Sequence, residues 1–205
     1  MLLFAHTGLT LGVIGLSCRV FSKLSSHRGG KVKPIPSSVL SLSSTNSDPP
    51  VDSRKWQVDY RFILLGSMFP DIVDKPLGML IFAGSIANGR VYTHTLIVNI
   101  TLVLIGIYLI KRKKPNFFLF SISSCFHLVL DEMWLTPKTL FWPFLGWGFP
   151  RENLSCWWEN IFQALFTNPW VYVPEIIGTL IIIVFGLILI KRKMLGKFLS
   201  QGIIR

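Results

Sequence analysis

Charged side chains are scarce in this chain of 205 residues, where Lys, Arg, Asp and Glu together make up 15% of the sequence. Soluble domains normally contain about a quarter charged residues, so the scarcity argues against a water-soluble enzyme. Hydrophobic residues make up 51%, and the mean hydropathy is +0.53. The composition indicates a single membrane domain over residues 1–205.

Cysteines and acidic residues are also few. Cys18, Cys125 and Cys156 are too scattered to predict a disulfide framework or a cysteine-based zinc site. The 10 acidic residues are outnumbered by 21 Lys and Arg, which gives a net charge of +11. This excess could suggest nucleic-acid binding, but the basic residues lie beside long apolar runs. They therefore indicate membrane topology, and no nucleic-acid partner is expected.

Long apolar runs predict where the chain crosses the membrane. The N-terminus lacks a charged n-region and an A-x-A cleavage site, so its apolar run is expected to be a retained span. At about 20 residues per crossing, we expect an all-α, polytopic transmembrane helix bundle with about five spans. These are residues 2–21, 62–85, 91–110, 116–135 and 170–190.

The segments between the spans predict the orientation. Residues 22–60 are rich in Ser, Pro and Lys and are expected to form a flexible basic cytoplasmic loop. An external N-terminus and a cytoplasmic C-terminus place 17 of the 21 Lys and Arg on the cytoplasmic side of the inner membrane. Residues 136–169 then form an aromatic-rich outer interfacial segment, either an aromatic belt or a lid that admits a lipid-like substrate.

Several polar residues interrupt the apolar spans. In "CFHLVLDEMW", residues 125–134, His127 and Asp131 lie one helical turn apart. A charge within a span costs roughly 2.5–3.5 kcal/mol, so each such residue calls for an explanation. At about 1.5 Å per residue, the predicted spans place six polar residues in the outer half of the membrane. They are His6, Asp71, Asp74, His94, His127 and Asp131.

This common depth predicts a shared polar cavity with a divalent metal ion, most naturally Zn²⁺ because the set is rich in histidine. The expected ligands are His6, Asp71, His94, His127 and Asp131. A remaining carboxylate, Asp74 or Asp131, would orient a ligand histidine or accept a proton from water. Glu175 is a weaker candidate for the same cavity.

Simpler interpretations remain open for individual residues. Asp71 or Asp74 could pair with Lys75, and His127 with Asp131 could be a hydrogen bond of helix packing. The whole set could be a structural cluster, or it could bind or transport a metal ion without catalysis. The inner halves of the third, fourth and fifth spans are almost wholly apolar, which disfavours a transport path.

Four motifs resemble those of a known family. They are "FAHTG", "LLGSMFPDIVDK", "GRVYTHT" and "HLVLDEMWLTPKTLFWPF", which cover most of residues 1–145. Their order is similar to that in the membrane-bound metal-dependent hydrolases of bacteria and archaea, which are small multi-spanning inner-membrane proteins. The chain has Ala5 before His6 where the family has Thr, and Gly89 where the family has a first His before Arg90 and the T-H pair.

The resemblance implies metal-dependent hydrolysis by His6, Asp71, Asp74, His94, His127 and Asp131. Arg90, which remains from the third motif, and Arg151 in the outer segment are the expected contacts for an anionic substrate group. Burial within the spans favours a lipid or lipid-linked phosphoester as substrate and membrane lipid as partner. The alternative is a non-enzymatic membrane protein with a structural metal or polar cluster.

Overall fold

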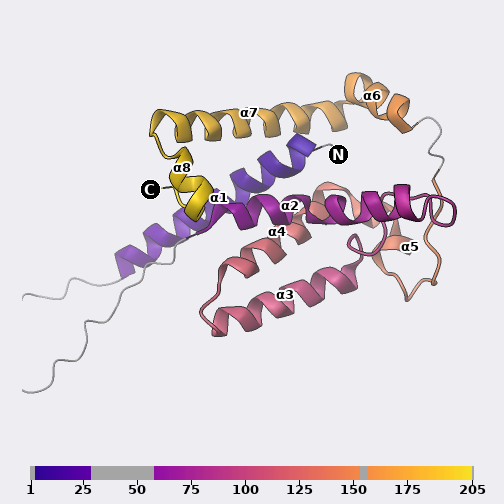
Figure 1. Cartoon of the computed structure of the whole chain (residues 1–205), viewed down its shortest axis with the longest axis horizontal. Coiled ribbons are helices and arrows are strands. Elements are labelled where there is room, and N and C mark those ends of the chain that lie inside the picture. The colour runs from indigo at the N-terminus through magenta and orange to yellow at the C-terminus, as the bar shows by residue number, and fades with distance from the viewer. Residues whose placement is uncertain (1–2, 29–57, 153–156, 205) are drawn as a thin grey trace, which may run out of the picture.

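The protein is helical in the computed structural model, which describes residues 3–28, 58–152 and 157–204 (Figure 1). No strand occurs in these ranges. The elements are α1 (Leu3–Arg28), α2 (Tyr60–Lys75), the π-helix η2 (Pro76–Ile81), α3 (Leu96–Lys111), α4 (Asn116–Leu130), the 3-10 helix η3 (Met133–Leu135), α5 (Pro137–Leu140), α6 (Trp157–Thr167), α7 (Pro169–Lys191) and α8 (Leu195–Gln201).

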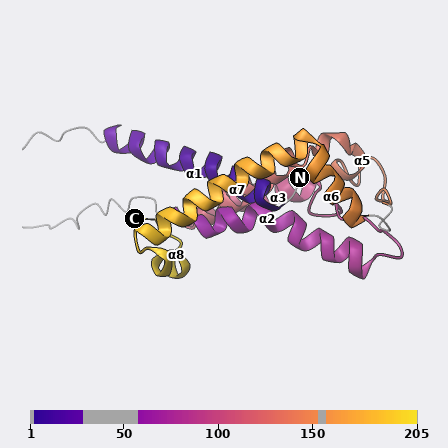
Figure 2. The ribbon, with the colours of Figure 1, turned by 90° about the horizontal axis from the view of Figure 1, so that it is seen from above.

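The five longest helical elements pack side by side, in an order that differs from their order in the chain. From top to bottom in Figure 1 they are α7, α1, α2, α4 and α3, and each contacts the next. Seen from above, α1 and α7 diverge toward the C-terminal end of α1 (Figure 2). The helix α2 therefore lies between α1 and α4, in the middle of the set.

Polar side chains cap the starts of three of these helices. Asp59 accepts a hydrogen bond from the N–H of Arg61, at 3.0 Å, and Asn168 does the same for Trp170. Thr95 caps α3. Such caps supply acceptors for N–H groups that have no partner within the helix.

The predicted spans match the helices to different degrees. The last one, 170–190, agrees with α7. The loop expected over 22–60 is wrong at its start, because α1 continues to Arg28. Nothing in that stretch breaks a helix before the glycine pair at 29–30. The rest of the expected loop lies mainly outside the described residues.

The middle spans contain shorter regular helices than the apolar runs predicted. In the third predicted span the helix α3 starts only at Leu96, and in the fourth the helix α4 ends at Leu130. Only α1, over Leu3–Val20, and α7 are long and apolar enough by themselves to cross a membrane, among the described residues. The second span changes from α-helix to π-helix at Pro76, because a proline has no N–H for the regular hydrogen bond.

Glycines allow two pairs of helices to approach closely. A Cβ atom at Gly8 of α1 would overlap the carbonyl group of Gly178 in α7. A Cβ atom at Gly66 of α2 would overlap the carbonyl group of Phe120 in α4. Small residues of this kind let helix backbones come into contact, as is common between helices in membranes.

The apolar core lies toward the end of the bundle where α8 packs. It consists of Leu11, Ile14, Tyr60, Ile63, Leu119, Leu189, Met194 and Phe198. Large apolar side chains on the outer faces are nevertheless exposed, among them Leu104 of α3 and Leu180 of α7, at 60% and 56%. Extended apolar surface of this kind suits contact with lipid.

The described part of the outer segment expected over 136–169 contains two short helices, α5 and α6. Its aromatic side chains cluster with a residue that precedes α3. The ring of Tyr92 contacts Trp142 and Phe149 edge to face, with centroids 5.5 and 5.1 Å apart. Trp147 is 79% exposed, as an aromatic belt would require.

Candidate metal centre

The five predicted ligands meet at one buried place. They come from the start of α1, from α2, from the turn before α3 and from the end of α4, and they are His6, Asp71, His94, His127 and Asp131. The three histidines have no solvent-accessible surface, and Asp71 is 6% exposed. Residues separated by more than one hundred positions along the chain thus form a single cluster.

The turn before α3 is built around Asp74. Its carboxylate accepts hydrogen bonds from the backbone N–H groups of Val91, Thr93 and His94, at 2.8 to 3.1 Å. It also pairs with Nδ1 of His94, at 2.7 Å. His94 was expected inside a helix, but this turn holds it just before α3 begins. Asp74 therefore orients a histidine, which is one of the two roles expected for it.

His127 is oriented by the backbone of α2. Its Nδ1 lies 2.7 Å from the carbonyl oxygen of Ser67, which can only accept a hydrogen bond. The proton of a neutral His127 therefore lies on Nδ1, and Nε2 carries the lone pair. The same reasoning applies to His94, whose Nδ1 faces the carboxylate of Asp74.

The two Nε2 atoms face each other at 3.3 Å. Oδ1 of Asp71 lies 3.7 Å from Nε2 of His94 and 3.8 Å from Nε2 of His127. When both histidines are neutral, the two Nε2 atoms and Oδ1 of Asp71 therefore face one another with lone pairs and with no proton between them. The other oxygen of Asp71 pairs with Lys75, at 2.8 Å, so the simple ion pair weighed from the sequence is also present.

A second group of possible ligands adjoins the first. Nε2 of His6 lies 3.1 Å from Oδ1 of Asp131, and the rings of His6 and His127 stack with centroids 4.0 Å apart. Arg90 donates from Nε to Oδ2 of Asp131, at 2.7 Å. Nδ1 of His6 is buried and has no hydrogen-bond partner among the described residues.

This donor set fits a divalent cation. Neutral imidazole nitrogens and carboxylate oxygens are the ligands that Zn²⁺ prefers, and the possible ligand atoms of Asp71, His94 and His127 all lie within 4.8 Å of one another. His94 and His127 each use Nδ1 for a fixed acceptor, which is the usual support of a metal-bound histidine. His6, His127 and Asp131 satisfy the same distance limit, so His127 belongs to both groups.

Two further candidates lie apart from the cluster. Arg151 is exposed and donates to the carbonyl oxygen of Gly84. Glu175 is buried, and its Oε2 accepts a hydrogen bond from the N–H of Ala5, at 3.2 Å. Glu175 therefore contacts the residue next to His6 and not the cluster itself.

Supporting residues include some that the sequence analysis missed. Asn99 donates to the carbonyl oxygens of Thr93 and Thr95, and Ser124 donates to Asn99, so α3 and α4 both hold the turn of His94. An asparagine within the apolar run "LIVNITLV" was the available signal for this role. The carbonyl group of Ser67 has no such signal, because every residue carries one.

Comparisons with known proteins identify the family of the chain. No curated protein and no solved structure matches it. A family model described as YdjM inner membrane protein matches residues 37–198, which is most of the sequence. The match contains four of the five clustered residues and begins after His6. The protein therefore belongs to the YdjM inner membrane protein family.

Proposed function

We propose that the protein is a metal-dependent hydrolase of the inner membrane. The observation that carries this proposal is the 3.3 Å separation of the two Nε2 atoms of His94 and His127. The Nδ1 atoms of both rings already face fixed acceptors. Two lone pairs this close repel each other unless a cation lies between them or one ring gains a proton.

His94, His127 and Asp71 are the residues that would hold the ion. Asp74 and the carbonyl group of Ser67 fix the two histidine rings, so these ligands need little rearrangement to bind a metal. A bound divalent ion supplies an acidified water and polarises a phosphoryl or carbonyl oxygen. We assign Zn²⁺ because histidines make up most of the set.

The neighbouring residues His6, Asp131 and Arg90 would transfer protons and bind the substrate. Asp131 holds Nε2 of His6, and Nδ1 of that ring has no partner among the described residues, so His6 oriented by Asp131 is our candidate for the general base in place of Asp74. The carboxylate of Asp74 already accepts three backbone N–H groups and one ring N–H, which leaves it poorly suited to take a proton. Arg90 is 35% exposed at its side chain, so its guanidinium group can meet an anionic substrate while contacting Asp131.

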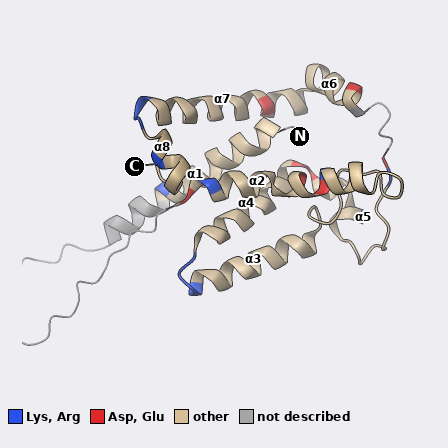
Figure 3. Cartoon of the chain, viewed as in Figure 1, with Lys and Arg blue, Asp and Glu red and all other residues tan. Residues whose placement is uncertain are grey.

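We further propose five membrane crossings, made by α1, by α2 continued through η2, and by α3, α4 and α7. At about 1.5 Å per residue, α3 and α4 reach roughly 24 and 22 Å, and the buried turns beside them would complete each crossing. Basic residues gather at one end of these helices, at Lys111–Lys114 and Lys191–Lys193, and the acidic stretch in the last turns of α2 lies toward the other end (Figure 3). This distribution supports a cytoplasmic basic end and a catalytic site in the outer half.

A lipid or lipid-linked phosphoester is the substrate class that best suits this position. The site is buried among helices with apolar outer faces, so a substrate would arrive from the membrane. The apolar core around Leu119 and Phe198 fills the basic end of the bundle, which argues against a path for ions across the protein. Hydrolysis is therefore favoured over metal transport.

The test is hydrolysis of a panel of lipid phosphoesters by purified protein in detergent. The wild type should lose activity with a chelator and regain it with Zn²⁺. Asp131→Asn should retain metal but lower kcat by about 10²-fold or more, because His6 would lose the carboxylate that holds its ring as general base. A wild type that binds metal but hydrolyses no member of the panel would favour the structural role instead.

A further inference from the structure

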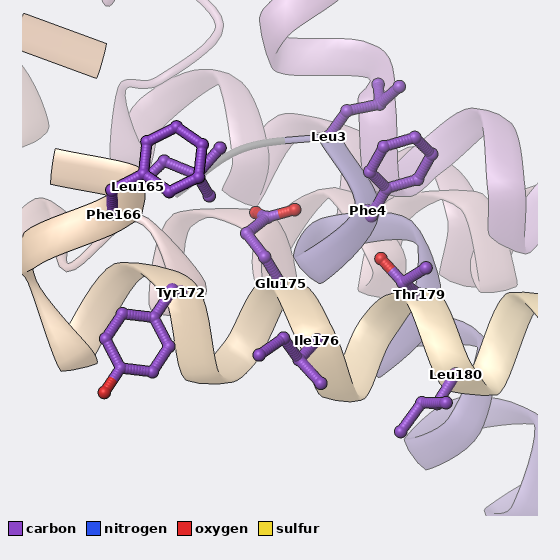
Figure 4. Close-up of a pocket in the computed structure, with 9 residues that line it drawn as sticks. All are labelled: Leu3, Phe4, Leu165, Phe166, Tyr172, Glu175, Ile176, Thr179 and Leu180. Atoms are coloured by element: carbon purple, nitrogen blue, oxygen red, sulfur yellow. The ribbon is translucent and has the colours of Figure 1, made fainter. Parts of the chain in front are cut away.

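A cavity of about 760 Å³ opens where α1, α6 and α7 meet (Figure 4). Most of its walls are apolar, with Leu3 and Phe4 from α1 and Leu165 and Phe166 from α6. Its volume is within the range of pockets that bind small ligands, roughly 300–1,000 Å³. The metal ligands are not among the residues that line it.

One acidic side chain points into this apolar cavity. The carboxylate of Glu175 extends between the side chains of α1 and α6 in Figure 4. Glu175 is 6% exposed, and one of its oxygens accepts the N–H of Ala5. Oε1, the other oxygen, is buried and has no hydrogen-bond partner among the described residues.

An unpaired oxygen of this kind calls for a hydrogen-bond donor that the described residues do not supply. A carboxylate accepts hydrogen bonds and cannot donate them when ionised. Leaving one of its oxygens buried without a partner costs on the order of 1–3 kcal/mol or more, and buried charges are normally paired. The best complement is a cationic N–H donor, because it supplies the hydrogen bond and neutralises the charge.

We propose that this cavity binds a membrane phospholipid whose head group carries a primary ammonium. The apolar walls, including Phe4 and Phe166, receive an acyl chain, and the ammonium donates to Oε1 of Glu175. A choline head group would not serve, because its quaternary nitrogen has no N–H. An anionic head group would be repelled by the carboxylate.

This lipid site does not depend on the proposed hydrolysis. The helix α1 separates the two places: His6 contacts Asp131 of the metal centre, and the neighbouring Ala5 contacts Glu175. A lipid in the cavity would therefore hold the start of α1 against α7. Whether the metal centre hydrolyses a lipid is a separate matter, and metal content measured in parallel distinguishes the two proposals.

The test is native mass spectrometry of the full-length protein in detergent with three phospholipids of identical acyl chains. These carry ethanolamine, choline or glycerol head groups. The wild type should retain the ethanolamine lipid about 10-fold better than the choline lipid, the scale of one hydrogen bond to a charged group. If the wild type retains all three lipids equally, or prefers the glycerol lipid, that result alone overturns the proposal.

Variants locate the preference at the cavity. Glu175→Gln should abolish the preference for ethanolamine and leave metal content unchanged. Glu159→Gln, which removes an exposed carboxylate from α6, is the matched control and should behave as the wild type. Phe166 is 78% exposed, so Phe166→Ala should fold normally and reduce retention of all three lipids. An undiminished ethanolamine preference in folded Glu175→Gln would contradict the assignment.

Discussion

His94 and His127 face each other through their Nε2 atoms at 3.3 Å, and the Nδ1 atoms of both rings are held from behind. The acceptors are different in kind: the carboxylate of Asp74 for His94 and the carbonyl oxygen of Ser67 for His127. Asp74 and Ser67 both belong to helix α2. The geometry of the two proposed ligands thus depends on one helix, which neither histidine belongs to.

The first prediction concerns Asp74. In Asp74→Asn, one carboxylate oxygen becomes an NH₂ group, which cannot accept from the N–H groups that Asp74 now serves. We expect metal affinity to fall by about 10–100-fold, as for other residues that support metal-bound histidines. Competition with a metal-binding dye measures the change.

Asp59→Asn is the matched control for that variant. Asp59 also accepts a backbone N–H, but it does so at the start of α2, far along the helix from Asp74. Asparagine caps helices as well as aspartate does, so metal affinity should stay at the wild-type value. An unchanged affinity in Asp74→Asn would show that Asp74 does not orient a metal ligand.

The second prediction concerns Arg90, which contacts Asp131 and is partly exposed. Arg90→Gln removes the positive charge that we assign to an anionic substrate, so KM should rise and metal content should stay unchanged. Arg112→Gln, at the other end of the protein, should have no effect on either quantity. Loss of metal in Arg90→Gln would instead assign the residue to the support of the cluster.

The third prediction concerns the contact between α1 and α7. In Gly178→Ala the new methyl group overlaps the backbone of Phe4, so the helices must separate. Overpacking of this kind costs about 1–3 kcal/mol, which should lower the Tm in detergent by several degrees. Gly186→Ala is the control on the same helix, because a Cβ there meets nothing within 4 Å. Its Tm should be unchanged or slightly higher.

The fourth prediction concerns topology. In a cysteine-free background, Lys113→Cys in the loop between α3 and α4 should resist a membrane-impermeant maleimide added to intact cells. Gly148→Cys, in the aromatic outer segment, should react. The opposite pattern of labelling would reverse the proposed orientation.

The composition of the site could be predicted from the sequence, but its geometry could not. His127 and Asp131 were visible because charges are costly in an apolar run, and helical rise brought the polar residues to a common depth. The turn that holds His94 was missed, although the apolar run begins only at Leu96 and Thr95 before it is a residue type that caps helices. The π-helical form of the stretch after Lys75 was not predicted either.

The central claim is that His94 and His127 share one divalent ion, and metal analysis of the purified protein tests it most directly. The wild type and three single variants, His27→Ala, His94→Ala and His127→Ala, would be purified without chelator and checked for monodisperse elution. We predict one Zn²⁺ per chain in the wild type and in His27→Ala, and almost none in the other two. Equal metal content in all four proteins, or no metal in the wild type, would contradict the account.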